Sequence, residues 1–305
     1  SNVNFSKMSL RSVLIHAKSS NVFTNKIILC SNLSSSSFRL FSNLAQQHSD
    51  RKSVLNQVHQ TVKGRKRFYK SVGVKEIDVD GSTKFEVTLD GRSLRTPGRN
   101  PMQFSNEAFA MALAAEWDSQ TSEKGIEPST MPLMTLVSTA IDHIAVDPNP
   151  TIENILKYFP TDTACYIADE EDRILRKRQL KLFTPVIKKL SKKFGVRIET
   201  TEALIGPVPH PPESLNKMRD VVELMDPLTL SALQCATMEC KSFILGLSLV
   251  SRVITVKEAQ ECARIEEEFQ IENWGAIENG HDLDRIGATV QLSAASTLLW
   301  LNEST

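Results

Sequence analysis

The sequence predicts an α+β protein: a small β-rich N-terminal domain, made of an antiparallel meander plus helices, followed by a C-terminal orthogonal helical bundle. In residues 72–79 and 85–89 apolar and polar side chains alternate, and an Asp-Gly step follows each run. Such alternation is typical of a half-buried strand, and Asp-Gly between two such runs indicates a tight hairpin. From residue 151 onward, apolar residues recur at helical spacing, which predicts the bundle.

A third strand is expected to continue through Leu94 and Thr96 until Pro97. Three strands bury one face at best, so the sheet needs a cover. We expect Ser105 to be the N-cap of a first covering helix that runs to Trp117. This helix is apolar nearly all round, which predicts deep burial.

A second helix is expected over 133–144, after which Pro148 and Pro150 break the chain. We therefore place an N-terminal α+β domain at 65–150 and a C-terminal α-helical domain at 151–305. The helices expected in the second domain span 152–158, 173–194, 213–224, 227–251, 256–271 and 282–301.

Two further expectations concern the C-terminal domain. Residues 195–200 form a short strand in our interpretation, placed after a helix stop at Gly195 and before a Pro-rich elbow. In the last helix the apolar residues at i,i+4 spacing predict a core face. They are Ile286, Val290, Ala294 and Leu298.

The N-terminus has a different composition. Residues 1–49 contain five basic residues, no Asp or Glu, and many serines, and a short apolar stripe over 10–17 has helical spacing. This composition is typical of an organelle transit peptide. We expect a mitochondrial transit peptide at 1–41 and a disordered linker at 42–64. Removing 1–41 leaves 31 Lys and Arg against 36 Asp and Glu, so the mature chain is mildly acidic.

Composition and missing motifs exclude several function classes. The net charge of the whole chain is zero, which gives no electrostatic argument for a nucleic-acid partner. The apolar run 243–250 is too short to span a membrane. No Walker A loop, G-x-G-x-x-G, G-x-S-x-G, H-E-x-x-H or C-x-x-C is present, so we expect no nucleotide, metal or other cofactor.

Two alternatives from other classes stay open at this point. A matrix hydrolase would use Asp142 and His143 together with Ser138, although neighbouring helical residues point about 100° apart. An RNA-associated factor would use the basic residues around Phe68 and Tyr69 within 63–70.

The helix expected over 256–271 places polar residues in an apolar face. Glu266 and Gln270 lie four residues apart in the middle of that face, Glu267 lies at its margin, and Trp274 follows the helix. A carboxylate in an apolar stripe needs a partner or loses its charge. Either an internal ion pair or cap satisfies this acid, or a group on another protein does.

Several short motifs together resemble one family. Any one of them is weak, but their order and spacing hold from residue 67 to the C-terminus. They are Leu89-Asp90-Gly91-Arg92, Leu94-Arg95-Thr96-Pro97, Glu116-Trp117-Asp118-Ser119-Gln120, Met131-Pro132-Leu133, Thr139-Ala140-Ile141-Asp142, Asp162-Thr163, Cys165-Tyr166, Gly206-Pro207, Ile265-Glu266-Glu267-Glu268-Phe269-Gln270 and Trp274-Gly275. The chain resembles the assembly factor 2 family, the chaperones that serve the alpha subunit of the catalytic head of mitochondrial ATP synthase.

The resemblance implies a function as well as a fold. It implies a non-enzymatic, ATP-independent chaperone of the mitochondrial matrix, which binds the alpha subunit and prevents its aggregation before assembly with beta. We expect a monomer without a cofactor, a nucleic-acid partner or a membrane span.

The resemblance also implies roles for individual residues. It implies that an acid of the Glu266–Glu267 pair is needed, and with Gln270 and Trp274 these form the expected partner-binding set. The wheel favours Glu266 pointing inward and Glu267 being presented at the edge. The expected structural residues of the family motifs are Asp90, Gly91, Arg92, Thr96, Pro97, Glu116, Trp117 and Asp142.

Overall fold

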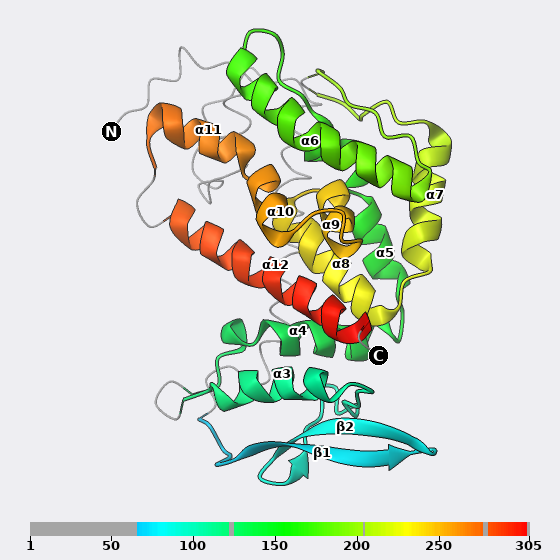
Figure 1. Ribbon diagram of the computed structural model, residues 1–305, viewed down its shortest axis with the longest axis vertical. Helices are drawn as coiled ribbons and strands as arrows, with labels where there is room; N and C mark the ends of the chain where they lie inside the picture. Colours follow the sequence, from blue (N-terminus) through cyan, green and yellow to red (C-terminus); the bar gives the residue numbers. More distant parts are fainter. Residues whose placement is uncertain (1–65, 122–124, 204, 277–279, 304–305) are drawn as a thin grey trace, which may run out of the picture.

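The computed structural model describes residues 66–121, 125–203, 205–276 and 280–303. It has the predicted α+β architecture: a small antiparallel sheet at one end of the molecule, followed by layers of helices (Figure 1). The predictions for 1–41 and 42–64 lie outside the described residues.

The sheet is the expected meander of three strands in the order β1-β2-β3. The strands are β1 (Val72–Val79), β2 (Ser82–Leu89) and β3 (Arg92–Ser93). Both Asp-Gly steps have positive φ at both residues, 53° and 76° at the first and 49° and 77° at the second, as the tightest hairpins require. The third strand is shorter than expected, because the chain turns back at Thr96, whose N–H donates to the carbonyl oxygen of Asn100.

Helix α3 (Glu107–Asp118) covers one face of the sheet and contacts β1 and β2. Two expectations about it are wrong. Its N-cap is Asn106, whose side-chain oxygen accepts from the N–H of Ala108, whereas the Ser105 hydroxyl accepts from the Lys84 ammonium. The helix is also not buried all round, since Met111 on its outer face is 57% exposed.

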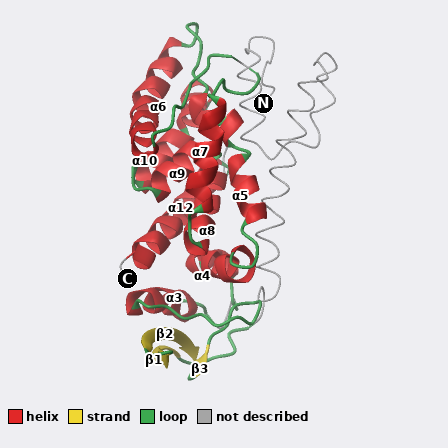
Figure 2. Cartoon of the chain, turned by 90° about the vertical axis from the view of Figure 1, so that its right-hand side faces the viewer, coloured by secondary structure: helices red, strands yellow, loops and turns green. Residues whose placement is uncertain are grey.

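Helix α4 (Pro132–Thr139) continues as one π-helical turn (Ala140–Ile144), which confirms the helix expected over 133–144. It lies between α3 and the helical bundle, as both views show (Figures 1 and 2). Because α4 contacts α8 and α12 of the bundle as well as α3, packing is continuous across residue 150. The division into domains at that residue stays a prediction.

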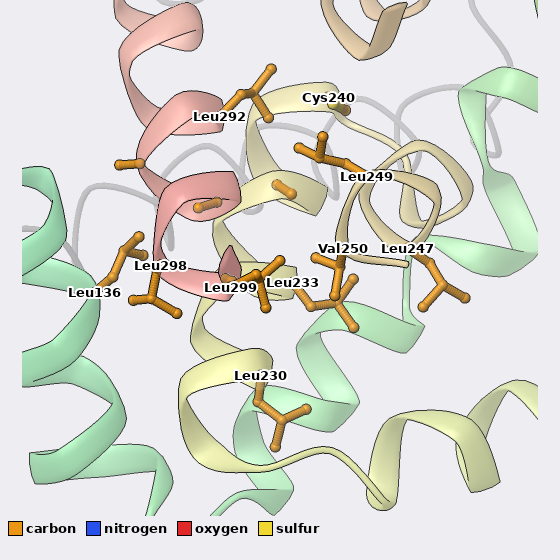
Figure 3. Close-up of a cluster of buried hydrophobic side chains, with 14 of the residues drawn as sticks. Leu136, Leu230, Leu233, Cys240, Leu247, Leu249, Val250, Leu292, Leu298 and Leu299 are labelled. Atoms are coloured by element: carbon orange, nitrogen blue, oxygen red, sulfur yellow. The ribbon is translucent and has the colours of Figure 1, made fainter. Parts of the chain in front are cut away.

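The remaining helices form the bundle. They are α5 (Asn149–Leu156), α6 (Arg173–Phe194), α7 (Pro212–Glu223), α8 (Pro227–Cys240), α9 (Phe243–Val250), α10 (Val256–Ala263), α11 (Ile265–Trp274) and α12 (His281–Glu303). All eight residues of α9 are buried. Leucines of α4, α8, α9 and α12 lie together in the core of the bundle (Figure 3).

Two long helices of the sequence prediction are each broken into two. Residues 227–251 divide at Lys241, which has φ 53°, and Ser242 caps α9 by accepting from the N–H of Leu245. Residues 256–271 divide at Arg264, which has φ −106° and ψ 4°. Each break provides a new helix N-terminus that side chains can cap. The helical periodicity of the sequence does not reveal where such a break occurs.

The strand expected at 195–200 is also wrong. After Gly195, which has φ 61°, the chain forms a loop, and only Thr201 pairs with Tyr166 in an isolated parallel bridge. The N–H of Glu199 donates instead to the ring of His210. A β-branched run without a partner strand remains irregular, because strand propensity is realised through pairing and burial.

Two carboxylates inside the protein join separate segments. Glu116 of α3 accepts from the N–H groups of Leu133 and Met134, each at 2.8 Å, at the start of α4. The fully buried Asp162 accepts from the Ser242 hydroxyl at 2.6 Å and the N–H of Ile244 at 2.9 Å, at the start of α9.

Burial perturbs both groups in the same direction. Burial raises the pKa of Glu116 from its usual 4.5 to about 7, against the opposing hydrogen bonds from Met134 and Leu133. Burial likewise raises the pKa of Asp162 from its usual 3.8 to about 6, against the bonds from Ser242 and the backbone. Such carboxyls stabilise the folded protein fully below the unfolded pKa, and this contribution is lost as the pH rises through the folded pKa.

We therefore expect the free energy of unfolding to decrease between about pH 5 and pH 8, and Glu116→Gln to remove about 2 to 3 kcal/mol of that decrease. Urea unfolding, followed by circular dichroism at several pH values, measures the free energy of unfolding of wild type and variant. The matched control is Glu107→Gln, an exposed residue of the same helix, which keeps the wild-type slope. Equal slopes for wild type and Glu116→Gln would contradict the assignment.

Candidate partner-binding surface

Helix α11 starts at a cluster of charged side chains that we call the Arg264 cluster, made of Arg264, Glu267, Glu268 and His281. The Arg264 side chain is 10% exposed, and its guanidinium lies 2.8 Å from the Glu267 carboxylate and 3.3 Å from that of Glu268. The same Glu267 oxygen lies 2.5 Å from Nδ1 of His281, the first residue of α12. The cluster thus ties the junction of α10 and α11 to the start of α12.

This geometry revises the expectation for Glu267. We expected its carboxylate at the edge of the helix, but the side chain is 17% exposed and points to Arg264 and His281. The reason is the helix break at Arg264, which changes the phase of all following residues relative to α10. A helical-wheel projection drawn for one continuous helix over 256–271 therefore placed Glu267 wrongly at the edge of the apolar face.

Glu266 and Gln270 lie on the inner side of α11. Glu266 points inward as expected, and its carboxylate accepts from the side-chain amide of Gln179 on α6 at 2.9 Å. Gln179 is fully buried and also accepts from the N–H of Ala168 at 2.7 Å. Gln270 is 8% exposed. Of the four expected partner-binding residues, only Trp274 is exposed, at 53%.

The N-terminal half of α12 exposes a stripe that sequence reasoning assigned to the core. Leu283, Ile286 and Val290 are 66%, 61% and 42% exposed, whereas Ala294 and Leu298 further along the same stripe are buried. The expected core face is therefore correct for Ala294 and Leu298 and wrong for Ile286 and Val290. The stripe continues past the edge of the bundle core. This half of the helix is held on another side by Gln260 of α10, which donates to the Arg285 carbonyl oxygen and the Thr289 hydroxyl, while Leu283, Ile286 and Val290 stay exposed.

The C-terminal end of α11 and the N-terminal end of α12 project on the same side of the molecule, on the left of Figure 1. We call Trp274, Leu283, Ile286 and Val290 the projecting apolar surface. Exposed charges accompany it: Asp282 and Asp284 on α12, and Glu272 on α11, which pairs with Arg178 at 2.8 Å. On α12 the three apolar residues follow one face of the helix, and exposed apolar side chains accompanied by charges are typical of an interaction site.

The residues of the family motifs lie elsewhere, and their acids bind backbone N–H groups. Asp90 accepts from the N–H groups of Lys70 and Ser71, and these bonds, that from Ser71 above all, hold the pKa of Asp90 below its usual value. Glu116 holds the start of α4, as described above. Gly91 forms the second hairpin, and Arg92 in β3 is exposed.

Asp142 fixes the turn at residues 96–100. One of its oxygens accepts from the Thr96 hydroxyl at 2.6 Å and the Asn100 amide at 2.8 Å, and the other accepts from the N–H of Gly98 at 2.7 Å. Pro97 lies within this turn and is half-buried. The motif around Thr96 and the motif around Asp142 are therefore two halves of one contact.

Trp117 is 5% exposed and packs edge-on against Tyr69, with ring centroids 5.6 Å apart. The Tyr69 hydroxyl donates to the carbonyl oxygen of Trp117 at 2.6 Å. This places Trp117 in the interior beside the first described residues. The structural role expected for the motif residues remains a prediction that these contacts favour.

The geometry does not support the hydrolase alternative. The Asp142 oxygens are taken by the 96–100 turn, His143 is exposed, and the Ser138 hydroxyl is 1% exposed without a hydrogen-bond partner in the described part of the chain. These three side chains therefore form no linked triad. Within the described ranges no group of three or more His, Cys, Asp or Glu residues is placed to hold a metal ion.

In the RNA alternative, one of the expected basic residues, Arg67, is already bound within the protein. Arg67 donates to the carbonyl oxygens of Gln120 at 2.7 Å, Asp118 at 3.0 Å and Tyr69 at 3.2 Å, and its side chain is 17% exposed. Phe68 is 67% exposed, while Lys63 and Arg65 lie outside the described residues. In the described part of the chain no helix has the length and apolarity needed to cross a bilayer.

An exposed apolar helix face on a folded α+β protein is typical of the class of proteins that bind other macromolecules. Residues 66–191 match the family model described as ATP12 chaperone protein. The crystal structure of Atp12 from Paracoccus denitrificans is similar with a TM-score of 0.69 and 31% identity, covering 78% of this chain and 98% of that one. The chain belongs to the ATP12 chaperone family, which confirms the resemblance seen in the sequence.

Two yeast proteins are also similar to this chain. Mitochondrial atp12 of Schizosaccharomyces pombe is 23% identical over 222 residues, which covers 70% of this chain and 76% of the yeast protein. Mitochondrial ATP12 of Saccharomyces cerevisiae is 27% identical over 263 residues, covering 73% and 80% respectively.

A pair of glycine substitutions tests the turn that Asp142 holds. A Cβ at Gly98 would lie 2.7 Å from the Asp142 carboxyl group, so we expect Gly98→Ala to lower the free energy of unfolding by about 1 to 3 kcal/mol. A Cβ at Gly287 in α12 meets nothing within 4 Å, so Gly287→Ala is expected to raise it by about 0.5 to 1 kcal/mol. Urea denaturation of both variants measures this, and a neutral Gly98→Ala would show that the turn is not held by Asp142.

A second pair tests the Arg264 cluster. Glu267→Lys places a cation beside Arg264 and His281 in a site of low exposure, so we expect a loss of about 3 kcal/mol in the free energy of unfolding. Glu261→Lys makes the same charge change at a residue that is 50% exposed and is expected to cost no more than about 0.5 kcal/mol. Thermal and urea unfolding compare them, and similar losses would mean that Glu267 is not held inside the cluster.

Proposed function

We propose that this protein is an ATP-independent chaperone that binds the alpha subunit of the catalytic head of mitochondrial ATP synthase and prevents its aggregation before it assembles with beta. Membership of the ATP12 chaperone family supports this proposal, as do the names of the similar proteins from Paracoccus denitrificans and the two yeasts. The observation that carries it is the projecting apolar surface on α11 and α12.

The projecting apolar surface supplies the binding energy in this proposal. Covering a Leu, Ile or Val side chain completely contributes about 1.5 to 3 kcal/mol, and Trp274 adds a larger aromatic anchor. Leu283, Ile286 and Val290 face outward from one helix, so a single flank of the alpha subunit can cover all three. The subunit surface that beta later covers is the occupant we propose.

The acids of α11 act indirectly in this proposal. Glu267 binds Arg264 and His281, and Glu266 binds Gln179, so both hold α11 in place instead of projecting toward a partner. Buried Gln270 has the same role, while Trp274 contacts the alpha subunit. Glu266, Glu267 and Gln270 are therefore positioning residues of the proposed interface.

Binding and release need no nucleotide in this proposal. The sequence contains no Walker A loop, and the surface binds through apolar burial, which requires no chemical step. Release follows when beta buries more of the alpha subunit than the chaperone does, since a moderate interface is displaced by a larger one. A non-enzymatic, monomeric protein meets these requirements.

We further propose that the protein works in the mitochondrial matrix. The basic, acid-free composition of residues 1–41 supports a transit peptide, and the yeast relatives are named as mitochondrial proteins.

The experiment measures protection of purified alpha subunit from aggregation by light scattering, with and without ATP. We expect wild type to protect equally in both conditions, and Leu283→Ser combined with Ile286→Ser to weaken protection about 100-fold, because two apolar side chains no longer contribute to binding. The double variant is expected to keep its thermal stability, since both residues are exposed.

The matched control removes apolar side chains elsewhere. Met111 on α3 and Leu224 after α7 are 57% and 88% exposed, and Met111→Ser with Leu224→Ser is expected to protect like wild type. If the control loses as much protection as the test variant, or if protection depends on ATP, the proposed function is wrong.

A further inference from the structure

Helix α6 has an unusual charge composition. Its 22 residues include nine Lys or Arg and no Asp or Glu, in a chain whose total charge is balanced. Two of its three arginines form ion pairs within the protein. Arg176 pairs with Glu202 at 2.6 Å and Arg178 with Glu272 at 2.8 Å, so these two charges are neutralised within the protein.

Four lysines of α6 form a stripe, which we call the lysine stripe: Lys177, Lys181, Lys188 and Lys192. At 100° per residue they fall within an arc of about 60°, and at 1.5 Å per residue they extend over about 22 Å. All four are exposed, and no carboxylate of the described residues forms an ion pair with them. The helix forms an outer edge of the molecule in both views (Figures 1 and 2).

Helix electrostatics explains only part of this pattern. Cations near a helix C-terminus are stabilising, which accounts for Lys192 and Lys193, but the effect is confined to the last turn. Four acidic residues, 169–172, precede the helix and neutralise its N-terminal end. Lys181 and Lys188 lie beyond the reach of both effects.

We propose that the lysine stripe docks the protein onto an anionic phospholipid surface. Lysine is a flexible point charge that suits a diffuse negative surface, whereas arginine suits bidentate contacts to fixed carboxylates. Interfaces with protein partners concentrate Trp, Tyr and Arg, whereas α6 contains no Trp or Tyr and two of its three arginines are paired within the protein. The exposed Ile174 and Leu180, 64% and 41% exposed on the same helix, add apolar contact with the headgroup region.

This docking surface is separate from the proposed chaperone site. It uses none of Trp274, Leu283, Ile286 or Val290, and it does not depend on the identity of the client. Without residues 1–41 the chain is mildly acidic, so it gains no general attraction to anions and binding has to come from the local array. Each lysine near an anionic bilayer strengthens binding about fivefold.

The test is sedimentation of the mature chain, without residues 1–41, with vesicles of phosphatidylcholine alone and of phosphatidylcholine with phosphatidylglycerol. We expect binding only to the anionic vesicles, lost at about 0.5 M NaCl, where charges are screened within a few ångströms. Combining Lys181→Glu, Lys188→Glu and Lys192→Glu is expected to weaken binding at least about 100-fold. The corresponding triple Gln variant is expected to show the same direction of change.

The matched control makes the same change of total charge away from α6, with Lys70→Glu, Lys75→Glu and Lys157→Glu, three exposed lysines. It is expected to bind within about threefold of wild type. Circular dichroism verifies that each variant is folded.

Three results would overturn the proposal: equal sedimentation of wild type with neutral and anionic vesicles, equal losses in the control and stripe variants, or vesicle binding by the stripe variant like wild type. Loss of alpha-subunit protection in the stripe variant, without vesicle binding by wild type, would instead make the stripe a protein interface. Loss of protection by the apolar-surface variants does not bear on this test.

Discussion

The fold depends on carboxylates that bind backbone N–H groups at the junctions between segments. Glu116 holds the start of α4, Asp162 holds the start of α9, and Asp142 holds the 96–100 turn. A helix N-terminus leaves several N–H groups without intrahelical partners, so a carboxylate from another segment satisfies a need that the local sequence leaves open. These contacts join the sheet, its covering helices and the bundle into one packed structure.

This use of acids bears on the hydrolase alternative, because the Asp142 carboxylate that it needed is bound to the 96–100 turn. Paired polar residues at fixed spacing are usual in active sites, yet here the spacing reflects which turn each acid must reach. Asp142 is 46 residues from Thr96 and bonds directly to its hydroxyl. With the acids occupied in this way, the proposed chaperone function uses a different feature, the projecting apolar surface on α11 and α12.

The sequence predicted the elements that local chemistry determines. Asp-Gly turns specified both hairpins, and periodicity located α6 at its observed bounds. It failed where contacts distant in sequence decide the outcome. The break at Lys241 is stabilised by Asp162, about 80 residues away, and the turn of Glu267 toward Arg264 follows from a break that the periodicity does not show. Sequence spacing also did not separate the buried from the exposed half of α12.

The wrong prediction for the N-terminal half of α12 has a physical cause. An apolar stripe with i,i+4 spacing is the same signal whether its cover is another part of the chain or another protein. In α12 the stripe is covered by the chain at Ala294 and Leu298 and left open at Leu283 and Ile286. The covered half anchors the helix in the core, so the open half is presented without a loss of order. A chaperone benefits from this combination, because a surface that is already ordered binds its client without the additional entropic cost of ordering that surface.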